Sequence, residues 1–142
     1  MQHRLRLIAA ASLAFFTALA QAAPAKLYKS ASCGCCGEYV NYLNANGIRP
    51  AVENREDMDA IKRQHGSDVA ASCHTLLIGG YTVEGHVPVT AIRKLLKEKP
   101  AIRGISAPGM PLDSPGMGEH KSGTLPVVAI GRDGKVSDWG KY

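Results

Sequence analysis

Along most of the chain after residue 24, hydrophobic residues either form short runs or recur every three to four positions. Short apolar runs bounded by Gly, Pro or Asn predict β-strands, and hydrophobic residues spaced three or four apart predict amphipathic helices. The predicted strands cover residues 25–28, 48–53, 75–78, 81–84, 125–130 and 135–139. Three helices are predicted. The first covers residues 38–46, the second begins after Asn54, which caps it, and the third covers residues 89–99. This alternation predicts an α/β fold in which helices flank a central sheet and a hairpin ends the chain.

The segment from Pro100 to Gly123 shows no period of either kind. It contains two Pro-Gly-Met units, one at residues 108–110 and one at residues 115–117. A loop of this length without regular structure is usually either functional or disordered. We therefore expect a long loop that carries Met110 and Met117 between the last helix and the terminal hairpin.

The N-terminus has the features of an export signal. A short basic region that includes Arg4 and Arg6 precedes an apolar run at residues 7–20, and Ala20-Gln21-Ala22 offers a cleavage site. The apolar run is shorter than the roughly 20 residues that a membrane-spanning helix needs. We expect a signal peptide at 1–22, a periplasmic location, and a single domain at 23–142 without a membrane span.

Charge argues against a nucleic-acid partner. The formal net charge is +5 over 142 residues, and removal of Arg4 and Arg6 with the signal lowers it by two, to +3. The remaining basic residues are spread over many loops and form no stripe along one element. The chain is also too short for two sizeable cores, so one elaborate site is the most that we expect.

The four cysteines are Cys33, Cys35, Cys36 and Cys73, and three of them lie within four consecutive positions. A disulfide stabilises a fold mainly by closing a long loop in the unfolded chain. A bridge inside residues 33–36 closes almost none, so the cluster indicates chemistry and not structural cross-linking.

The position of the cluster suggests two kinds of chemistry. It lies just before the helix at 38–46, where unpaired backbone N–H groups and the helix dipole favour a thiolate. Cys33 and Cys36 have the Cys-x-x-Cys spacing of thioredoxin-type redox sites. Cys35 adds a third sulfur that a dithiol catalyst does not need, and thiolates favour soft metals such as Cu(I).

The other candidate ligands favour copper. In a thioredoxin-like arrangement Cys73, at the start of a strand, would face the cluster, and His86 follows the next strand. Met110 and Met117 offer thioethers, which suit Cu(I) and are unusual for zinc. No second Cys-x-x-Cys pair supports zinc, and the usual iron–sulfur spacings are absent.

The remaining histidines are weaker candidates. For His86, a metal ligand and a hydrogen-bonding loop residue are equally good interpretations. His74 is expected to point away from a site that its neighbour Cys73 faces, because side chains alternate along a strand. His65 precedes Gly66 and is expected to cap a helix.

Several ordered motifs together resemble the domain-of-unknown-function 411 family, whose better-known members are CopG-type periplasmic copper-resistance proteins. The motifs are Cys33-Gly34-Cys35-Cys36, Cys73-His74-Thr75, the run Val83-Glu84-Gly85-His86-Val87-Pro88, and the two Pro-Gly-Met units. The resemblance spans residues 27 to 130. It implies a thioredoxin-like fold that holds copper, either singly or as a sulfur-bridged multi-copper cluster.

The family's ligands carry over to Cys33, Cys35, Cys36 and Cys73, and less directly to His86, Met110 and Met117. Gly118 stands between Met117 and Glu119, where the family pattern differs, so the resemblance does not extend to His120 as a ligand.

Two functions remain open. The first is a periplasmic copper-binding protein of copper resistance, with copper or thiol redox activity and a copper-handling protein or reductant as partner. The second is a thiol–disulfide oxidoreductase in which Cys33 attacks and Cys36 resolves the mixed disulfide.

Overall fold

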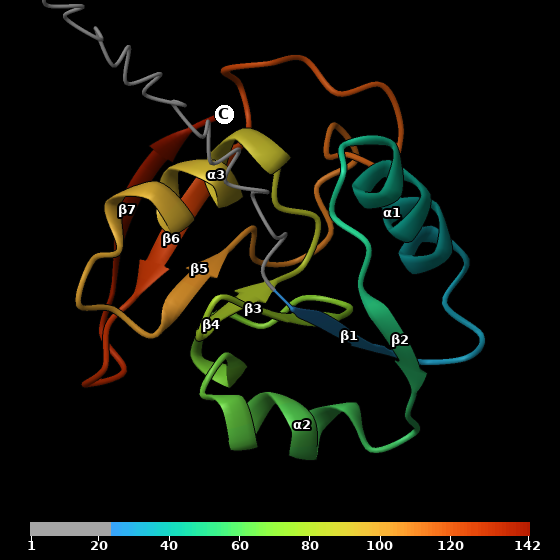
Figure 1. Cartoon of the computed structure of the whole chain (residues 1–142), viewed down its shortest axis with the longest axis horizontal. Helices are drawn as coiled ribbons and strands as arrows, with labels where there is room; N and C mark the ends of the chain where they lie inside the picture. The colour runs from blue at the N-terminus through green and yellow to red at the C-terminus, as the bar shows by residue number, and fades with distance from the viewer. Residues whose placement is uncertain (1–23) are drawn as a thin grey trace, which may run out of the picture.

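A computed structural model describes residues 24–142, and the predicted signal peptide lies outside these described residues. Seven strands, three helices and one 3-10 turn make up the described part (Figure 1). In chain order they are β1 (Ala25–Lys29), α1 (Gly34–Ala45), β2 (Ala51–Asn54), α2 (Met58–His65), η1 (Asp68–Ala70), β3 (Thr75–Ile78), β4 (Tyr81–Glu84), α3 (Val89–Glu98), β5 (Gly104–Ser106), β6 (Pro126–Ile130) and β7 (Val136–Lys141).

All seven described strands belong to one mixed sheet with the order β2-β1-β3-β4-β5-β6-β7. The pairs β1–β2 and β4–β5 are parallel, and the other neighbours are antiparallel. The predicted thioredoxin-like α/β class is confirmed, with a central mixed sheet, flanking helices and the C-terminal hairpin β6–β7.

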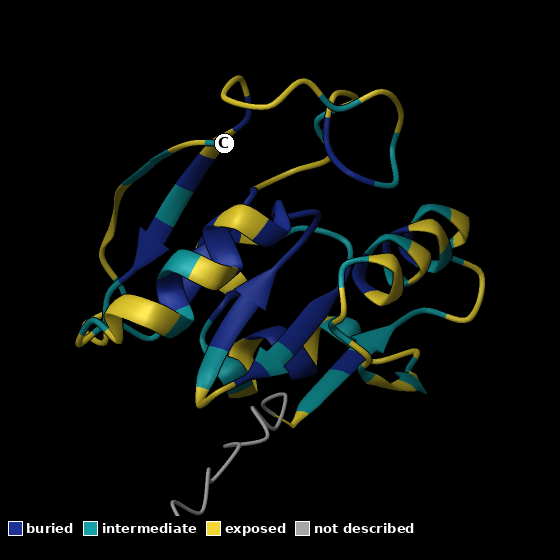
Figure 2. Cartoon of the chain, turned by 45° about the horizontal axis from the view of Figure 1, so that its top comes forward, coloured by how far each residue is buried: buried dark blue, intermediate teal, exposed yellow. Residues whose placement is uncertain are grey.

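One face of the sheet is apolar and forms the main core. Leu27, Leu76, Val83 and Ile105 stand opposite one another across four neighbouring strands, and all four are fully buried. Helices α1 and α3 cover this face with their own buried side chains, which are Tyr39, Leu43, Val89, Ala91, Ile92 and Leu95. Figure 2 shows the resulting buried layer between α3 and the strands.

The opposite face carries several polar residues beside the buried Ile130, and hydrogen bonds tie it to α2 and η1. Thr82 Oγ1 donates to the carbonyl of His65 (3.2 Å), and Ser106 Oγ donates to the carbonyl of Ala70 (2.6 Å). Glu84 lies on the same face and pairs with Lys62 of α2 at 2.7 Å. The sheet is therefore attached by apolar packing on one side and by directional polar contacts on the other.

Several boundaries differ from the sequence prediction, and β2, for example, begins at Ala51 instead of residue 48. The segment predicted to be one loop contains β5, whose three residues are too few to show a period. Helix α1 begins at Gly34 instead of residue 38, because its first turn consists of Gly and Cys residues that do not mark a helix start. Asp57, and not Asn54, occupies the N-cap of α2.

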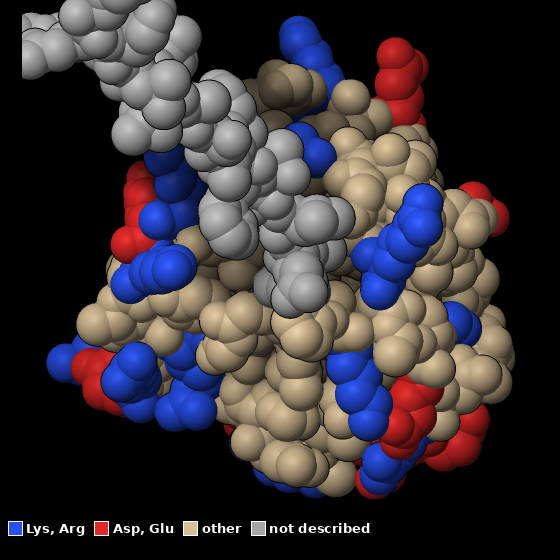
Figure 3. Space-filling view, viewed as in Figure 1, with Lys and Arg blue, Asp and Glu red and all other residues tan. Residues whose placement is uncertain are grey.

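Basic and acidic side chains are mixed on the visible surface of the domain. On the face seen in Figure 3, Lys and Arg side chains are scattered among acidic and uncharged ones and form no continuous stripe. Among residues 24–142, no helix is long and apolar enough to cross a bilayer.

The close approach of β5 to β4 gives a first prediction. A Cβ on Gly104 would stand 1.7 Å from the carbonyl oxygen of Thr82, and this backbone atom cannot move without breaking the sheet. Gly104→Ala should therefore lower the free energy of unfolding by more than about 2 kcal/mol, as measured by urea denaturation.

The same substitution at Gly37 serves as the control. Gly37 lies inside α1 with nothing within 4 Å of the added methyl group. Gly37→Ala should stabilise the protein by about 0.5–1 kcal/mol, because alanine loses less backbone entropy in a helix. Equal stabilities for the two variants would contradict the assigned packing of β5.

Candidate metal centre

The N-terminus of α1 carries three of the four cysteines. Cys33 is the N-cap residue with extended backbone (φ −78°, ψ 96°), and Cys35 and Cys36 lie in the first turn. Cys33 and Cys36 form a disulfide, and their Cα atoms are 5.4 Å apart. Cys36 is fully buried against the core, whereas Cys33 and Cys35 are partly exposed. The helix N-terminus places unpaired N–H groups beside these sulfurs, which stabilises negative charge on them.

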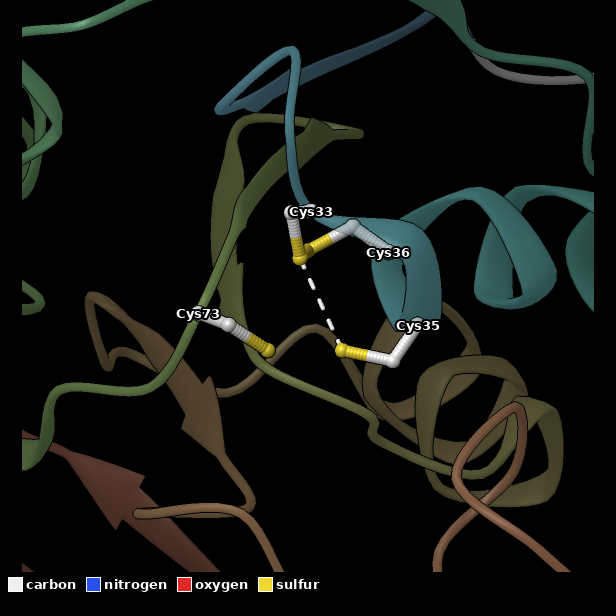
Figure 4. A group of neighbouring side chains, drawn as sticks. All are labelled: Cys33, Cys35, Cys36 and Cys73. Atoms are coloured by element: carbon white, nitrogen blue, oxygen red, sulfur yellow. Dashed lines mark hydrogen bonds between the residues drawn. A yellow bond between two sulfur atoms is a disulfide. The ribbon is translucent and has the colours of Figure 1, made fainter.

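Cys73 approaches the cluster from the sheet. It lies in the bend that precedes β3, and its sulfur is within 4.8 Å of each of the three sulfurs of α1. Cys35 Sγ in turn lies 3.6 Å from Cys33 Sγ (Figure 4). The predicted convergence of the lone cysteine with the cluster is confirmed, while the role of the four sulfurs as ligands stays a prediction.

His86 extends the group of donor atoms on the side of the sheet. Its Nε2 lies 3.0 Å from Cys73 Sγ, and its Nδ1 lies 2.7 Å from the carbonyl oxygen of Pro115. A carbonyl can only accept a hydrogen bond, so Nδ1 carries the proton and the lone pair of Nε2 faces Cys73. Histidines that bind metals are commonly oriented by such a bond from the other ring nitrogen.

His74 also faces the site, so the prediction that it points away is wrong. It is fully buried, and its Nδ1 lies 3.7 Å from Cys73 Sγ. One donor atom from each of Cys36, Cys73, His74 and His86 forms a second group in which every pair is within 4.8 Å. The alternation argument fails because β3 begins only at Thr75, so His74 lies in the preceding bend.

Tyr39 of α1 forms an aromatic wall behind the two histidines. Its ring centroid lies 4.5 Å from that of His74 and 5.1 Å from that of His86, and its hydroxyl donates to the carbonyl of Val87 at 2.6 Å. The wall keeps water away from the inner side of the site. His74 Nε2, which is buried, has no hydrogen-bond partner among the described residues.

Burial sets the protonation of the metal-free site. Burial raises the pKa of the Cys73 thiol, although a hydrogen bond with Ser72 opposes the change. Burial first, and then the neighbouring His86, lower the pKa of His74 well below its ordinary value. Burial likewise lowers the pKa of His86, against the effect of its bond to Pro115. Both imidazoles are therefore neutral near pH 7, and neutral imidazole is the form that binds metals.

The long loop at residues 107–124 joins β5 to β6 (Figures 1 and 2) and is attached to the site at Gly109, Pro115 and Gly116. Gly109 bonds to the Cys73 segment, because its N–H donates to Ala71 O at 3.0 Å and its carbonyl accepts from Ser72 Oγ. Gly116 packs on α1 with φ +82°, and a Cβ there would stand 2.7 Å from Tyr39 N. Only glycine fits this contact without displacing the helix.

The two methionines of the loop differ in exposure. Met110 is 62% exposed, so most of its side chain faces solvent, and Met117 is partly buried beside Gly116. His120 Nδ1 donates to the carbonyl of Asp113 at 2.8 Å. The roles of Met110 and Met117 as ligands stay predictions.

Sequence reasoning misassigned His65 and missed Glu84. The C-cap of α2 is Gly66 in the left-handed region (φ 66°), and the ring of His65 instead stacks on Tyr28 with 5.8 Å between centroids. Glu84 is a fully buried carboxylate that ends β4, two residues before His86. Its signal was an acidic residue that ends the strand 81–84 and directly precedes a Gly-His pair.

Comparisons with known proteins agree with this geometry. Residues 70–117 match the model of the family described as "Protein of unknown function, DUF411". Two solved structures titled "Copper resistance protein copG", forms 2 and 1, are each 36% identical to this chain with a TM-score of 0.77. Each match covers 86% of this chain and 99% or 98% of the solved chain. No curated protein matches the chain.

The neutral buried histidines predict how the stability of the metal-free protein depends on pH. The folded-state pKa values of His74 and His86 lie below the unfolded value of about 6.5. Their stabilising contribution is therefore complete above pH 6.5 and is lost as the pH falls below it, since the unfolded chain then binds the extra protons. The free energy of unfolding should fall between pH 7 and pH 5, by up to about 1.4 kcal/mol per pH unit for each histidine.

Urea denaturation of the metal-free protein at a series of pH values measures this effect. His74→Gln removes one of the two groups and should give a shallower slope than the wild type. A flat profile, or the same slope in both proteins, would show that His74 titrates normally in the folded state.

Proposed function

The chain belongs to the DUF411 family, together with the copG copper resistance proteins that it resembles, and from this premise we propose that it binds Cu(I) as part of copper resistance. The observation that carries the proposal is the meeting of four sulfurs from two separate segments within 4.8 Å. Thiolates bind Cu(I) in preference to hard cations.

The arrangement of donors favours more than one copper ion per chain. Cys36 and Cys73 belong both to the all-sulfur group and to the group with the two histidines. A thiolate can bridge two metal ions, so these shared sulfurs would connect an ion held by Cys33 and Cys35 to one held by His74 and His86. We accordingly propose a sulfur-bridged multi-copper site with Cys36 and Cys73 at its centre.

The disulfide between Cys33 and Cys36 adds a redox step to the proposal. Two of the four sulfurs cannot act as thiolate ligands while this bond exists. Two electrons from a reductant break the bond and give two thiolates. In the reverse direction, two Cu(II) ions each take one electron from the dithiolate, which yields two Cu(I) ions and the disulfide. Copper reduction and disulfide formation can thus be coupled at one site.

We further propose that the protein acts in the periplasm after removal of residues 1–22. The basic region, apolar run and small residues at Ala20 and Ala22 support export, and an oxidising compartment would form the disulfide. Its partners would then be copper ions and a periplasmic copper-handling protein or reductant.

Copper loading of the fully reduced protein tests the bridged site. Without oxygen, the wild type should bind more than one Cu(I) per chain, as measured by elemental analysis together with thiol counting. Cys36→Ser should reduce this to one or fewer, because it removes a donor from both groups.

Cys35→Ser is the matched control, since Cys35 belongs to only one of the two groups. It should retain more copper than Cys36→Ser. One ion or fewer in the wild type would refute the multi-copper site, and equal losses in the two variants would refute the bridging role of Cys36.

A thiol–disulfide oxidoreductase is the second candidate function. It is favoured by the position of the Cys33–Cys36 disulfide at the N-terminus of α1 in a thioredoxin-like fold. Cys33 is partly exposed and Cys36 is fully buried, so Cys33 would attack the substrate and Cys36 would release it.

Insulin reduction by the metal-free protein distinguishes this candidate. Turnover well above the background of the reductant, lost in Cys33→Ser and inhibited by Cu(I), is the result expected of an oxidoreductase. Turnover at the background level would leave copper binding as the function and exclude general disulfide reduction.

A further inference from the structure

We propose that Glu84 is the positioning residue of the copper site, and that its carboxylate holds Cys73 and His74 at the distance from His86 that metal binding requires. This inference rests on the proposed copper function, but the positioning itself is testable without copper. Glu84 would act through the backbone and side chains around these donors and would not bind the metal.

The carboxylate of Glu84 is fully buried and accepts four hydrogen bonds. Oε1 accepts from Lys62 Nζ at 2.7 Å and from the backbone N–H of Ser72 at 2.8 Å. Oε2 accepts from Ser67 Oγ and from Thr75 Oγ1, both at 2.7 Å. Both oxygens are thus saturated by donors from separate segments of the chain, which fixes the carboxylate in one orientation.

Two of these donors immediately flank the candidate ligands. Ser72 precedes Cys73 and Thr75 follows His74, so the carboxylate holds the two-residue segment between them at both ends. Thr75 is also the cross-strand partner of Glu84 in the pairing of β3 with β4. This side chain therefore helps to set the positions of Cys73 and His74 relative to β4.

The residues after Glu84 connect His86 to this carboxylate and its four hydrogen bonds, which together we call the clamp. Gly85 (φ +74°) donates its N–H to the carbonyl of His74 at 2.9 Å. A Cβ at Gly85 would stand 2.3 Å from Ser72 Oγ and 2.8 Å from the carbonyl of Ala107, so only glycine fits. In three consecutive residues, Glu84 forms the clamp, Gly85 makes the close backbone contact, and His86 is a candidate metal ligand.

Stability alone does not account for a buried ion pair at this position. The side chain of Lys62 is 7% exposed and that of Glu84 is 0% exposed. Well-packed apolar residues often stabilise a core as much as, or more than, a buried pair, because both charges must be removed from water. A carboxylate differs from an apolar residue in fixing the directions of several donors at once, and here two of those donors bracket the site.

Two variants that remove the same kind of bond test the proposal. Thr75→Val and Ser67→Ala each remove one hydroxyl donor from Oε2, and both residues are fully buried. Only Thr75 adjoins the ligands. We expect similar losses of thermal stability, but a roughly tenfold weaker Cu(I) affinity in Thr75→Val against less than threefold in Ser67→Ala. Anaerobic competition with a chromophoric Cu(I) chelator measures the affinities, and Thr75→Ser, which keeps the hydroxyl, should restore wild-type binding.

A copper-independent readout separates this inference from the proposed function. The rate at which Cys73 is alkylated in the folded, metal-free protein, followed by peptide mass spectrometry, should rise in Thr75→Val and not in Ser67→Ala. Equal alkylation rates in the two variants would overturn the positioning role even if the wild type binds Cu(I). A wild type that binds no Cu(I) but shows the difference in alkylation would refute the copper function and keep the clamp.

Should Thr75→Val fail to fold, the double variant Lys62→Met with Glu84→Gln replaces it. This pair removes both charges together, so neither is left buried without its partner. The side-chain oxygen of the introduced glutamine can still accept hydrogen bonds. Its amide nitrogen cannot accept them from the donors that faced the other carboxylate oxygen. Wild-type Cu(I) affinity and wild-type alkylation of Cys73 in this variant would overturn the proposal.

Discussion

The buried carboxylate of Glu84 is the constraint on which the geometry of the site depends. Four donors around it come from α2, from the start of η1 and from the two residues that flank Cys73 and His74. Apolar packing on the other face of the sheet is close but not directional, whereas these hydrogen bonds have preferred lengths and directions. The hydrogen bonds of the polar face therefore fix Cys73 and His74, and the apolar face supplies most of the stability of the fold.

The two faces meet at the end of the sheet where the site lies. Helix α1 is attached to the apolar face through Tyr39 and Leu43, and this attachment carries Cys33, Cys35 and Cys36 to the edge of the sheet. Tyr39 also contacts both histidines, so α1 carries three of the sulfurs and also forms the wall behind the two imidazole rings. The loop at residues 107–124 contacts the same helix through Gly116. Tyr39 thus links the three elements that carry or cover the donor atoms.

Sequence reasoning predicted what depends on local pattern and missed what depends on a few long-range contacts. The alternation of apolar residues predicted six of the strands, and the spacing of the cysteines predicted a site near a helix start. Strand β5 could not be predicted, because three residues show no period and Gly104 is explained only by the nearby Thr82 carbonyl. His74 was misplaced because a strand rule was applied one residue before β3 begins. The burial of Glu84 depends on Lys62, 22 positions earlier in the chain, which no local pattern connects to it.

The site has two halves, and the disulfide belongs to only one of them. The Cys33–Cys36 disulfide lies entirely within the first turn of α1, whereas Cys73 and both histidines lie on the side held by Glu84 and by the Pro115 carbonyl. All four donors to Glu84 come from outside α1, so breaking or forming the disulfide leaves the clamp unchanged. The sheet side can therefore keep Cys73, His74 and His86 arranged in both redox states, while α1 gains or loses two thiolates. If copper reduction is coupled to the disulfide as proposed, the electrons would be exchanged at α1, while the sheet would keep the other three donors in place.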